Sequence, residues 1–142
     1  MNSSKTNTSD LENFKVDVKI KLSALWASVM FCYIYGDYFS LYVPKKIEEF
    51  INVETPLDSP IKLFAASILM AIPALMIFLS IALKPKMSKW LNIILGTIYT
   101  AIMILIAITS IAPWWAFSVF LAIVEIGITS LIVWHAWKWP KQ

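Results

Sequence analysis

The sequence contains a single cysteine, Cys32, and no arginine. One cysteine cannot form a disulfide within the chain, and by itself it does not make a metal motif. The sequence also lacks a phosphate-binding loop, a set of paired metal ligands and a nucleophile placed beside a general base. These absences remove the usual signs of a cofactor, a metal or a catalysed reaction, so an enzyme is the least favoured class of function.

Charged residues make up only 15% of the chain, and its twelve positive side chains are all lysines. The net charge of +3 has the right sign for nucleic acid. The lysines, however, cluster at the ends of long apolar stretches, where they set membrane topology and contact lipid headgroups. The sequence therefore favours a lipid bilayer over a nucleic acid as the partner of these charges.

Hydrophobic residues account for 59% of the chain, whereas a typical soluble domain has about 45–50%. The excess is concentrated in four blocks. Each block is close to the ~20 apolar residues that a helix needs to cross a bilayer. The sequence therefore predicts four membrane spans, at residues 22–43, 61–83, 90–112 and 114–137.

These spans predict an all-α membrane protein, with four transmembrane helices in an antiparallel bundle that forms one domain over residues 22–139. Residues 1–21 precede it as a polar cytoplasmic tail and an interfacial lead-in. Between the first two spans, Ile47, Phe50 and Ile51 fall at helical spacing, opposite charged residues. This pattern predicts a short amphipathic helix on the membrane surface.

The distribution of lysines predicts the orientation of the chain. Nine of them fall on the side of the two termini and of the turn between spans two and three: Lys5, Lys15, Lys19, Lys21, Lys84, Lys86, Lys89, Lys138 and Lys141. Three fall on the other side among four acids: Lys45, Lys46 and Lys62, with Glu48, Glu49, Glu54 and Asp58. Because cytoplasmic loops carry the excess of lysine, we expect both termini in the cytoplasm and the protein in the cell (cytoplasmic or inner) membrane.

Two carboxyl groups lie within the predicted spans, and a charge inside a bilayer is expensive enough to need a reason. Asp37 is six residues from the outer end of the first span, which corresponds to a depth of about 9 Å. Tyr33 and Glu125 both fall near the midplane, at roughly 15–17 Å from the outer face. If both helix faces point inward, these three side chains form a file that leads into the bundle.

The candidate ligand or proton site consists of the intramembrane acids and the polar side chains nearest to them in depth or on the same helix face: Asp37, Tyr33, Glu125, Tyr99, Ser67 and Thr129. Two structural alternatives stay open. The acids can form buried hydrogen bonds that fix the register of the helices, or they can contact a partner subunit.

Spans two and three contain residues that affect helix geometry. Pro73 has no amide hydrogen, so it should kink the second span and release the carbonyl of Leu69. In a bilayer this carbonyl needs another partner. In the third span, Asn92, Gly96 and Thr100 lie near one face, which predicts a surface for close helix packing.

Four segments of the chain stand in an order that matches a known family: LSALWASVMFCYIYGDYFSLYVP at 22–44, ILMAIP at 68–73, KWLNIILGTI at 89–98 and VEIGITSLIVWHAWKW at 124–139. With them the chain resembles a bacterial family of small four-span membrane proteins, catalogued as domain-of-unknown-function 6326. The resemblance supports the positions of Asp37 and Glu125 but implies no reaction, because the family's function is unassigned. It also implies an acid at position 71 and an asparagine at position 32. This chain has Ala71 and Cys32 there, which weakens a transport role.

Two classes of function remain. In the first, the protein is a structural or regulatory membrane subunit, as a homo-oligomer or with a partner, and its buried acids fix helix packing or that partner. In the second, the region around Asp37 and Glu125 binds a small molecule, a lipid or a proton, or transports it. Four short spans without an internal repeat leave little room for alternating access, so the sequence favours the first class.

Overall fold

The computed structural model describes residues 15–140, which form helices joined by short connections. The elements are α1 (Val18–Ser40), α2 (Lys46–Ile51), α3 (Pro60–Ala82), α4 (Pro85–Thr109), the 3-10 turn η1 (Pro113–Trp115) and α5 (Ala116–Trp137). Within residues 15–140 there is no strand, and four helices are long and apolar enough to cross a membrane. The predicted all-α class, with a short helix between the first two spans, is confirmed. The polar tail predicted before residue 14 lies outside the described residues.

Some helix ends differ from the predicted span ends. α1 begins at Val18 because the carboxylate of Asp17 accepts a hydrogen bond from the Lys19 amide (2.8 Å) and caps the helix. Part of the predicted interfacial lead-in is therefore the first turn of α1. The helix ends at Ser40, ahead of Pro44. α4 begins at Pro85, five residues before the predicted span, because proline fits the first position of a helix.

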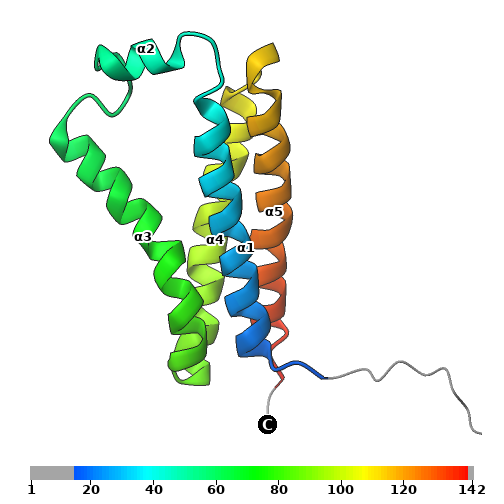
Figure 1. The fold of residues 1–142 in the computed structure, drawn as a ribbon. Helices are drawn as coiled ribbons and strands as arrows, with labels where there is room; N and C mark the ends of the chain where they lie inside the picture. Colours follow the sequence, from blue (N-terminus) through cyan, green and yellow to red (C-terminus); the bar gives the residue numbers. More distant parts are fainter. Residues whose placement is uncertain (1–14, 141–142) are drawn as a thin grey trace, which may run out of the picture.

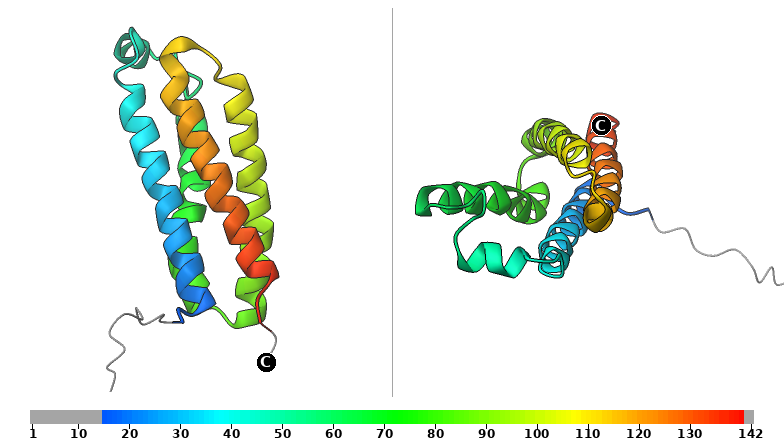
Figure 2. Two further views of the ribbon diagram at one scale, coloured as in Figure 1. Left: turned by 90° about the vertical axis from the view of Figure 1, so that its right-hand side faces the viewer. Right: turned by 90° about the horizontal axis from the view of Figure 1, so that it is seen from above.

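The long helices run in alternating directions, and α5 packs against both α1 and α4 (Figures 1 and 2). The core is made of large side chains from all four long helices: Trp26, Met76, Tyr99 and Ile132. The rings of Trp26 and Tyr99 meet edge to face, with centroids 5.9 Å apart. α4 and α5 approach closely at Gly96, as the small residues of span three predicted. A Cβ atom at Gly96 would lie 2.8 Å from Cγ2 of Val133.

α3 packs against the other helices through its C-terminal half. Its buried residues are Pro73, Met76 and Ser80, whereas residues 61–69 are exposed apart from the half-buried Ala66. Figure 1 shows the N-terminal half of α3 turning away from α1 and α4. The helices therefore pack together most fully at the end that holds Val18 and Trp137, and they separate toward α2.

A buried hydrogen-bond cluster joins three helices at the end where they pack most fully. The indole Nε1 of Trp26 in α1 donates to Oδ1 of Asn92 in α4 (2.7 Å), and the hydroxyl of Ser80 in α3 donates to the same oxygen (3.3 Å). The amide of Asn92 donates to the carbonyl of Ser88 (2.8 Å), and the hydroxyl of Ser88 donates to the carbonyl of Ser80 (3.0 Å). Because these residues are fully buried, their hydrogen bonds fix the register of α1, α3 and α4.

Candidate functional site

A cavity of about 250 Å³ lies between α1, α4 and α5 near the C-terminal end of α1. Its polar side chains are Tyr33, Asp37, Ser40, Ser110, Ser118 and Glu125. The structure therefore brings Tyr33, Asp37 and Glu125, which belong to the predicted site, to one cavity. The rest of the lining is mostly apolar, which suits a small molecule held by few polar contacts.

Two polar atoms of the lining are buried and have no hydrogen-bond partner among residues 15–140: Oη of Tyr33 and Oε2 of Glu125. The exposed fraction is 8% for Tyr33 and 4% for Glu125. Leaving one buried donor or acceptor unpaired costs about 1–3 kcal/mol, so such groups are rare in native proteins. Both atoms belong to side chains that line the same cavity.

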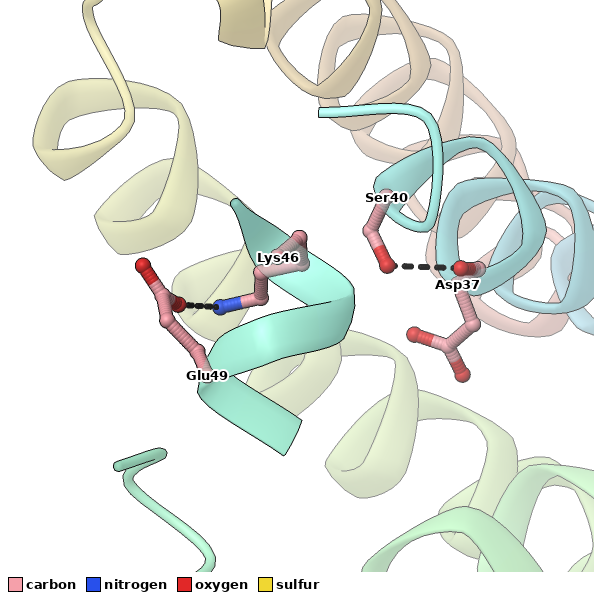
Figure 3. Close-up of polar contacts among 4 residues, drawn as sticks. All are labelled: Asp37, Ser40, Lys46 and Glu49. Atoms are coloured by element: carbon pink, nitrogen blue, oxygen red, sulfur yellow. Dashed lines mark hydrogen bonds and ion pairs between the residues drawn. The ribbon is translucent and has the colours of Figure 1, made fainter. Parts of the chain in front are cut away.

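Asp37 lies at the rim of the cavity. Its side chain is exposed, and α1 ends three residues after it, at Ser40. The hydroxyl of Ser40 donates to the backbone carbonyl of Asp37 (2.6 Å), and Figure 3 shows the Asp37 carboxylate extending away from this bond. Within residues 15–140 the carboxylate forms no ion pair. Asp37, Tyr33 and Glu125 thus run from the exposed rim to the buried wall.

α2 lies across this end of the molecule, between the ends of α1 and α3 (Figure 1). The Lys46 ammonium forms an ion pair with Glu49 (3.0 Å), as Figure 3 shows. It also lies 5.6 Å from the ring centroid of Trp115, whose side chain lines the cavity. This cation–π contact attaches α2 to the cavity rim. It places the Lys46–Glu49 pair on the same side of α1 as Asp37 (Figure 3).

The other predicted site residues do not line this cavity. The Tyr99 hydroxyl donates to the carbonyl of Leu69 in α3, although the ring lies 6.5 Å from that of Tyr33. The Thr129 hydroxyl donates to the Glu125 carbonyl (2.8 Å) and accepts from Thr100 (2.7 Å). Both hydroxyl groups are therefore used in helix packing.

Ser67 is exposed, and its hydroxyl donates to the carbonyl of Leu63 in its own helix (2.9 Å). The prediction placed Ser67 at the depth of Asp37 by counting residues along the span. Depth does not tell which half of a helix packs inward. Ser67 belongs to the N-terminal half of α3, which turns away from α1 and α4 (Figure 1). Ser67 therefore makes no contact with the cavity.

Several lining residues were not predicted from the sequence. Met70, Met103 and Trp115 complete the wall from three different elements. Methionine and tryptophan within apolar stretches give no signal of their own, because the same residues fill ordinary cores and membrane interfaces. The face of α5 that lines the cavity is visible in the sequence, because Ser118, Ala122 and Glu125 recur at helical spacing. All three line the cavity.

Across residues 15–140, no group of three or more histidine, cysteine, aspartate or glutamate side chains could hold a metal ion. The polar groups that line the cavity include the two carboxyl groups of Asp37 and Glu125, the thiol of Cys32, and the hydroxyl groups of one tyrosine and three serines.

The four long apolar helices define a multi-span α-helical membrane protein, and a partly open cavity with polar side chains lies between them. The chain belongs to a family of unknown function (DUF6326), whose model matches residues 11–142. Comparison with curated proteins and with solved structures finds no match for this chain. The predicted family is confirmed, and it assigns no activity.

Proposed function

We propose that this membrane protein binds a small molecule in the cavity between α1, α4 and α5. The observation that carries the proposal is the pair of buried, unpartnered polar atoms, Oη of Tyr33 and Oε2 of Glu125, on side chains that line one cavity. A ligand that donates one hydrogen bond to Glu125, and that donates one to the Tyr33 hydroxyl or accepts one from it, would satisfy both buried atoms.

The contacts favour binding over a purely structural role for the acids, although the sequence favoured the structural role. Helix register is fixed by other residues, above all by the bond between Trp26 and Asn92. In contrast, the carboxyl groups of Asp37 and Glu125 form no hydrogen bond to another helix within the described range. A carboxyl group kept inside an apolar bundle without a packing contact is best explained by a bound partner.

The chemistry of the cavity indicates the class of ligand. Two carboxyl groups, Asp37 at the rim and Glu125 at the buried wall, suit a molecule that carries an amine, an ammonium or several hydroxyl groups. Asp37 would attract a cationic molecule to the rim, and Tyr33 and Glu125 would hold it inside. A proton relay through the same side chains is the simplest variant of this proposal.

Native mass spectrometry of the protein released gently from its own membrane tests the proposal. We expect a reproducible bound small molecule, which is lost in Glu125→Gln and in Tyr33→Phe. The matched control is Glu54→Gln, because Glu54 is an exposed acid that does not line the cavity. Retention of the same molecule in both cavity variants would show that it binds elsewhere.

We also propose that both chain termini face the cytoplasm of a bacterial cell and that α2 lies on the opposite surface of the same membrane. The lysine excess at the terminal end supports this orientation. A labelling test needs exposed positions. Ser88, near the start of α4, is fully buried and is therefore unsuitable. In a Cys32→Ala background, Lys84→Cys should resist an impermeant thiol reagent in intact cells, whereas Glu54→Cys should react. The reverse pattern would invert the topology.

A subunit role has one observation in its favour, which is the separated N-terminal half of α3. Its large apolar side chains are exposed, among them Phe64, which is 67% exposed. A second copy of the chain packed there would bury this surface. Disulfide crosslinking of Ala65→Cys in the Cys32→Ala background should then give a dimer in native membranes, whereas Ile98→Cys on α4 should not.

A further inference from the structure

At the end of the molecule opposite the polar cavity, a second cavity of about 510 Å³ lies where α1 begins, α4 begins and the chain leaves α5. Three lysines line it, Lys19, Lys86 and Lys89, together with one acid, Asp17. Val18, Trp139 and two prolines complete the wall. We propose that this cavity, called here the basic cavity, binds the phosphate group of an anionic phospholipid.

Two lysines of the basic cavity are held in place by backbone carbonyls at helix ends. The Lys19 ammonium donates to the carbonyls of Ile81 (3.0 Å) and Leu83 (2.6 Å), at the end of α3. The Lys89 ammonium donates to the carbonyl of Trp137 (3.3 Å), the last residue of α5. An ammonium carries three donors, so both groups keep a donor for an anion. Their positions are already ordered, which reduces the entropy lost on binding.

Lys86 is the lysine of the cavity that is free to contact a ligand. Among residues 15–140 its ammonium forms no hydrogen bond and no ion pair. It lies in the first turn of α4, which begins at Pro85 without a side-chain cap. The first amide hydrogens of a helix attract anions. An anion beside Lys86 would therefore also accept hydrogen bonds from the amides of this first turn.

The acid of the cavity cancels only part of this positive charge. The Asp17 carboxylate is used as the cap of α1, where it accepts the Lys19 amide hydrogen. Three lysines against one carboxylate leave the cavity positive. The same end of the molecule also carries Lys15, Lys21, Lys84 and Lys138, with no further acid in the described range. A zwitterionic headgroup would gain less from this field than an anionic one.

The position of the basic cavity favours a lipid over a free phosphate ion. It lies at the end of the membrane-spanning helices, where lipid headgroups are found. The indole of Trp139 lines it beside the lysines, and tryptophan settles at headgroup level. Basic cavities between spanning helices are known to hold anionic headgroups. The apolar wall would contact the first carbons of the acyl chains while the lysines hold the phosphate.

Lipid titration of the full-length protein in detergent, followed by native mass spectrometry, tests the proposal. The probes are phosphatidylglycerol and phosphatidylcholine with the same acyl chains. We expect tighter binding of phosphatidylglycerol, and a loss of affinity of about fivefold in Lys86→Gln, since one lysine near the surface contributes that much. Lys86 is the residue to change because Lys19 and Lys89 also hold helix ends.

Lys84→Gln is the matched control, because Lys84 immediately precedes α4 but does not line the cavity. It removes the same charge from the same end of the molecule, so its effect should stay below about twofold. Equal losses in Lys84→Gln and Lys86→Gln would overturn the proposal in favour of diffuse surface charge. Binding of inorganic phosphate as tight as that of phosphatidylglycerol would overturn it in favour of a free-anion site. Equal binding of the two lipids would refute it as well.

Discussion

The hydroxyl of Tyr99 in α4 donates a hydrogen bond to the carbonyl of Leu69 in α3. Leu69 stands four residues before Pro73, and proline has no amide hydrogen to offer this carbonyl. The bond therefore supplies the partner that the proline removes. It also joins α3 to α4, two helices that separate toward the N-terminal end of α3 (Figure 1). This hydrogen bond between two spans thus replaces the backbone hydrogen bond that α3 lacks at Pro73.

The first prediction is that Tyr99→Phe destabilises the protein because the Leu69 carbonyl loses its partner. We expect a decrease of about 1–3 kcal/mol in the free energy of unfolding, the usual cost of one unpaired buried polar group. The measurement is reversible unfolding in detergent micelles with increasing dodecyl sulfate.

A double-mutant cycle with Pro73→Ala separates this explanation from a simple loss of packing. An alanine at position 73 restores an amide hydrogen for the Leu69 carbonyl, so Tyr99→Phe should cost about 1 kcal/mol less in that background. Equal costs in the two backgrounds would mean that the hydroxyl does not compensate for the proline.

The second prediction concerns Tyr33, whose hydroxyl is buried without a partner among the described residues. Tyr33→Phe removes this hydroxyl and keeps the ring, so the unfolding free energy of the ligand-free protein should be unchanged or up to about 1 kcal/mol higher. The same unfolding assay compares Tyr33→Phe with Tyr99→Phe directly. A loss as large as that of Tyr99→Phe would show that the Tyr33 hydroxyl has a partner within the protein, and the binding proposal would lose its main support.

The contrast between these tyrosines shows what the sequence could and could not predict. The released carbonyl of Leu69 followed from Pro73 alone, because helix geometry fixes which residue loses its partner. Its new partner did not follow, since Tyr99 is thirty residues away along the chain. Depth along a span placed Tyr33, Tyr99 and Glu125 together, but rotation about the helix axis decides which side chain meets which helix. The four spans themselves were predictable because length and apolar content suffice.

The cluster around Asn92 was not predicted as a polar contact. The sequence predicted that Asn92 lies on a packing face beside Gly96, but it did not identify Trp26 as its partner. Trp26 is fully buried, and its indole reaches across the bundle to Asn92. An asparagine in an apolar span is itself a signal of a buried partner, because its amide must be satisfied there. The identity of that partner depends on how α1 and α4 cross, which local patterns do not encode.

The third prediction is that Asn92→Ala destabilises the protein by about 1–3 kcal/mol, since it removes the acceptor of both Trp26 and Ser80. The fluorescence of Trp26 should also shift, which a Trp26-only variant of the chain would report. The control is Thr97→Ala in the same helix. Thr97 is exposed and its hydroxyl bonds only to the carbonyl of Ile93 in its own helix. Equal effects of the two substitutions would argue against Asn92 as the centre of the cluster.

The fourth prediction tests the close approach of α4 and α5. In Gly96→Ala, the new Cβ would lie 2.8 Å from Cγ2 of Val133, so the Val133 side chain or one of the two helices has to shift. We expect a loss of about 1–3 kcal/mol in unfolding free energy, as for other overpacked sites. The branched Val133 side chain has little freedom to move aside, and the second substitution Val133→Ala should therefore recover most of the loss.

Gly127 in α5 provides the matched control for Gly96. A Cβ atom there would meet no other atom within 4 Å. Gly127→Ala should be neutral or stabilising by up to about 1 kcal/mol, because alanine is the better helix former. If Gly96→Ala and Gly127→Ala had the same effect, the separation of α4 and α5 would not be set by the glycine. Opposite signs, with rescue by Val133→Ala, would establish that this contact sets the separation of α4 and α5.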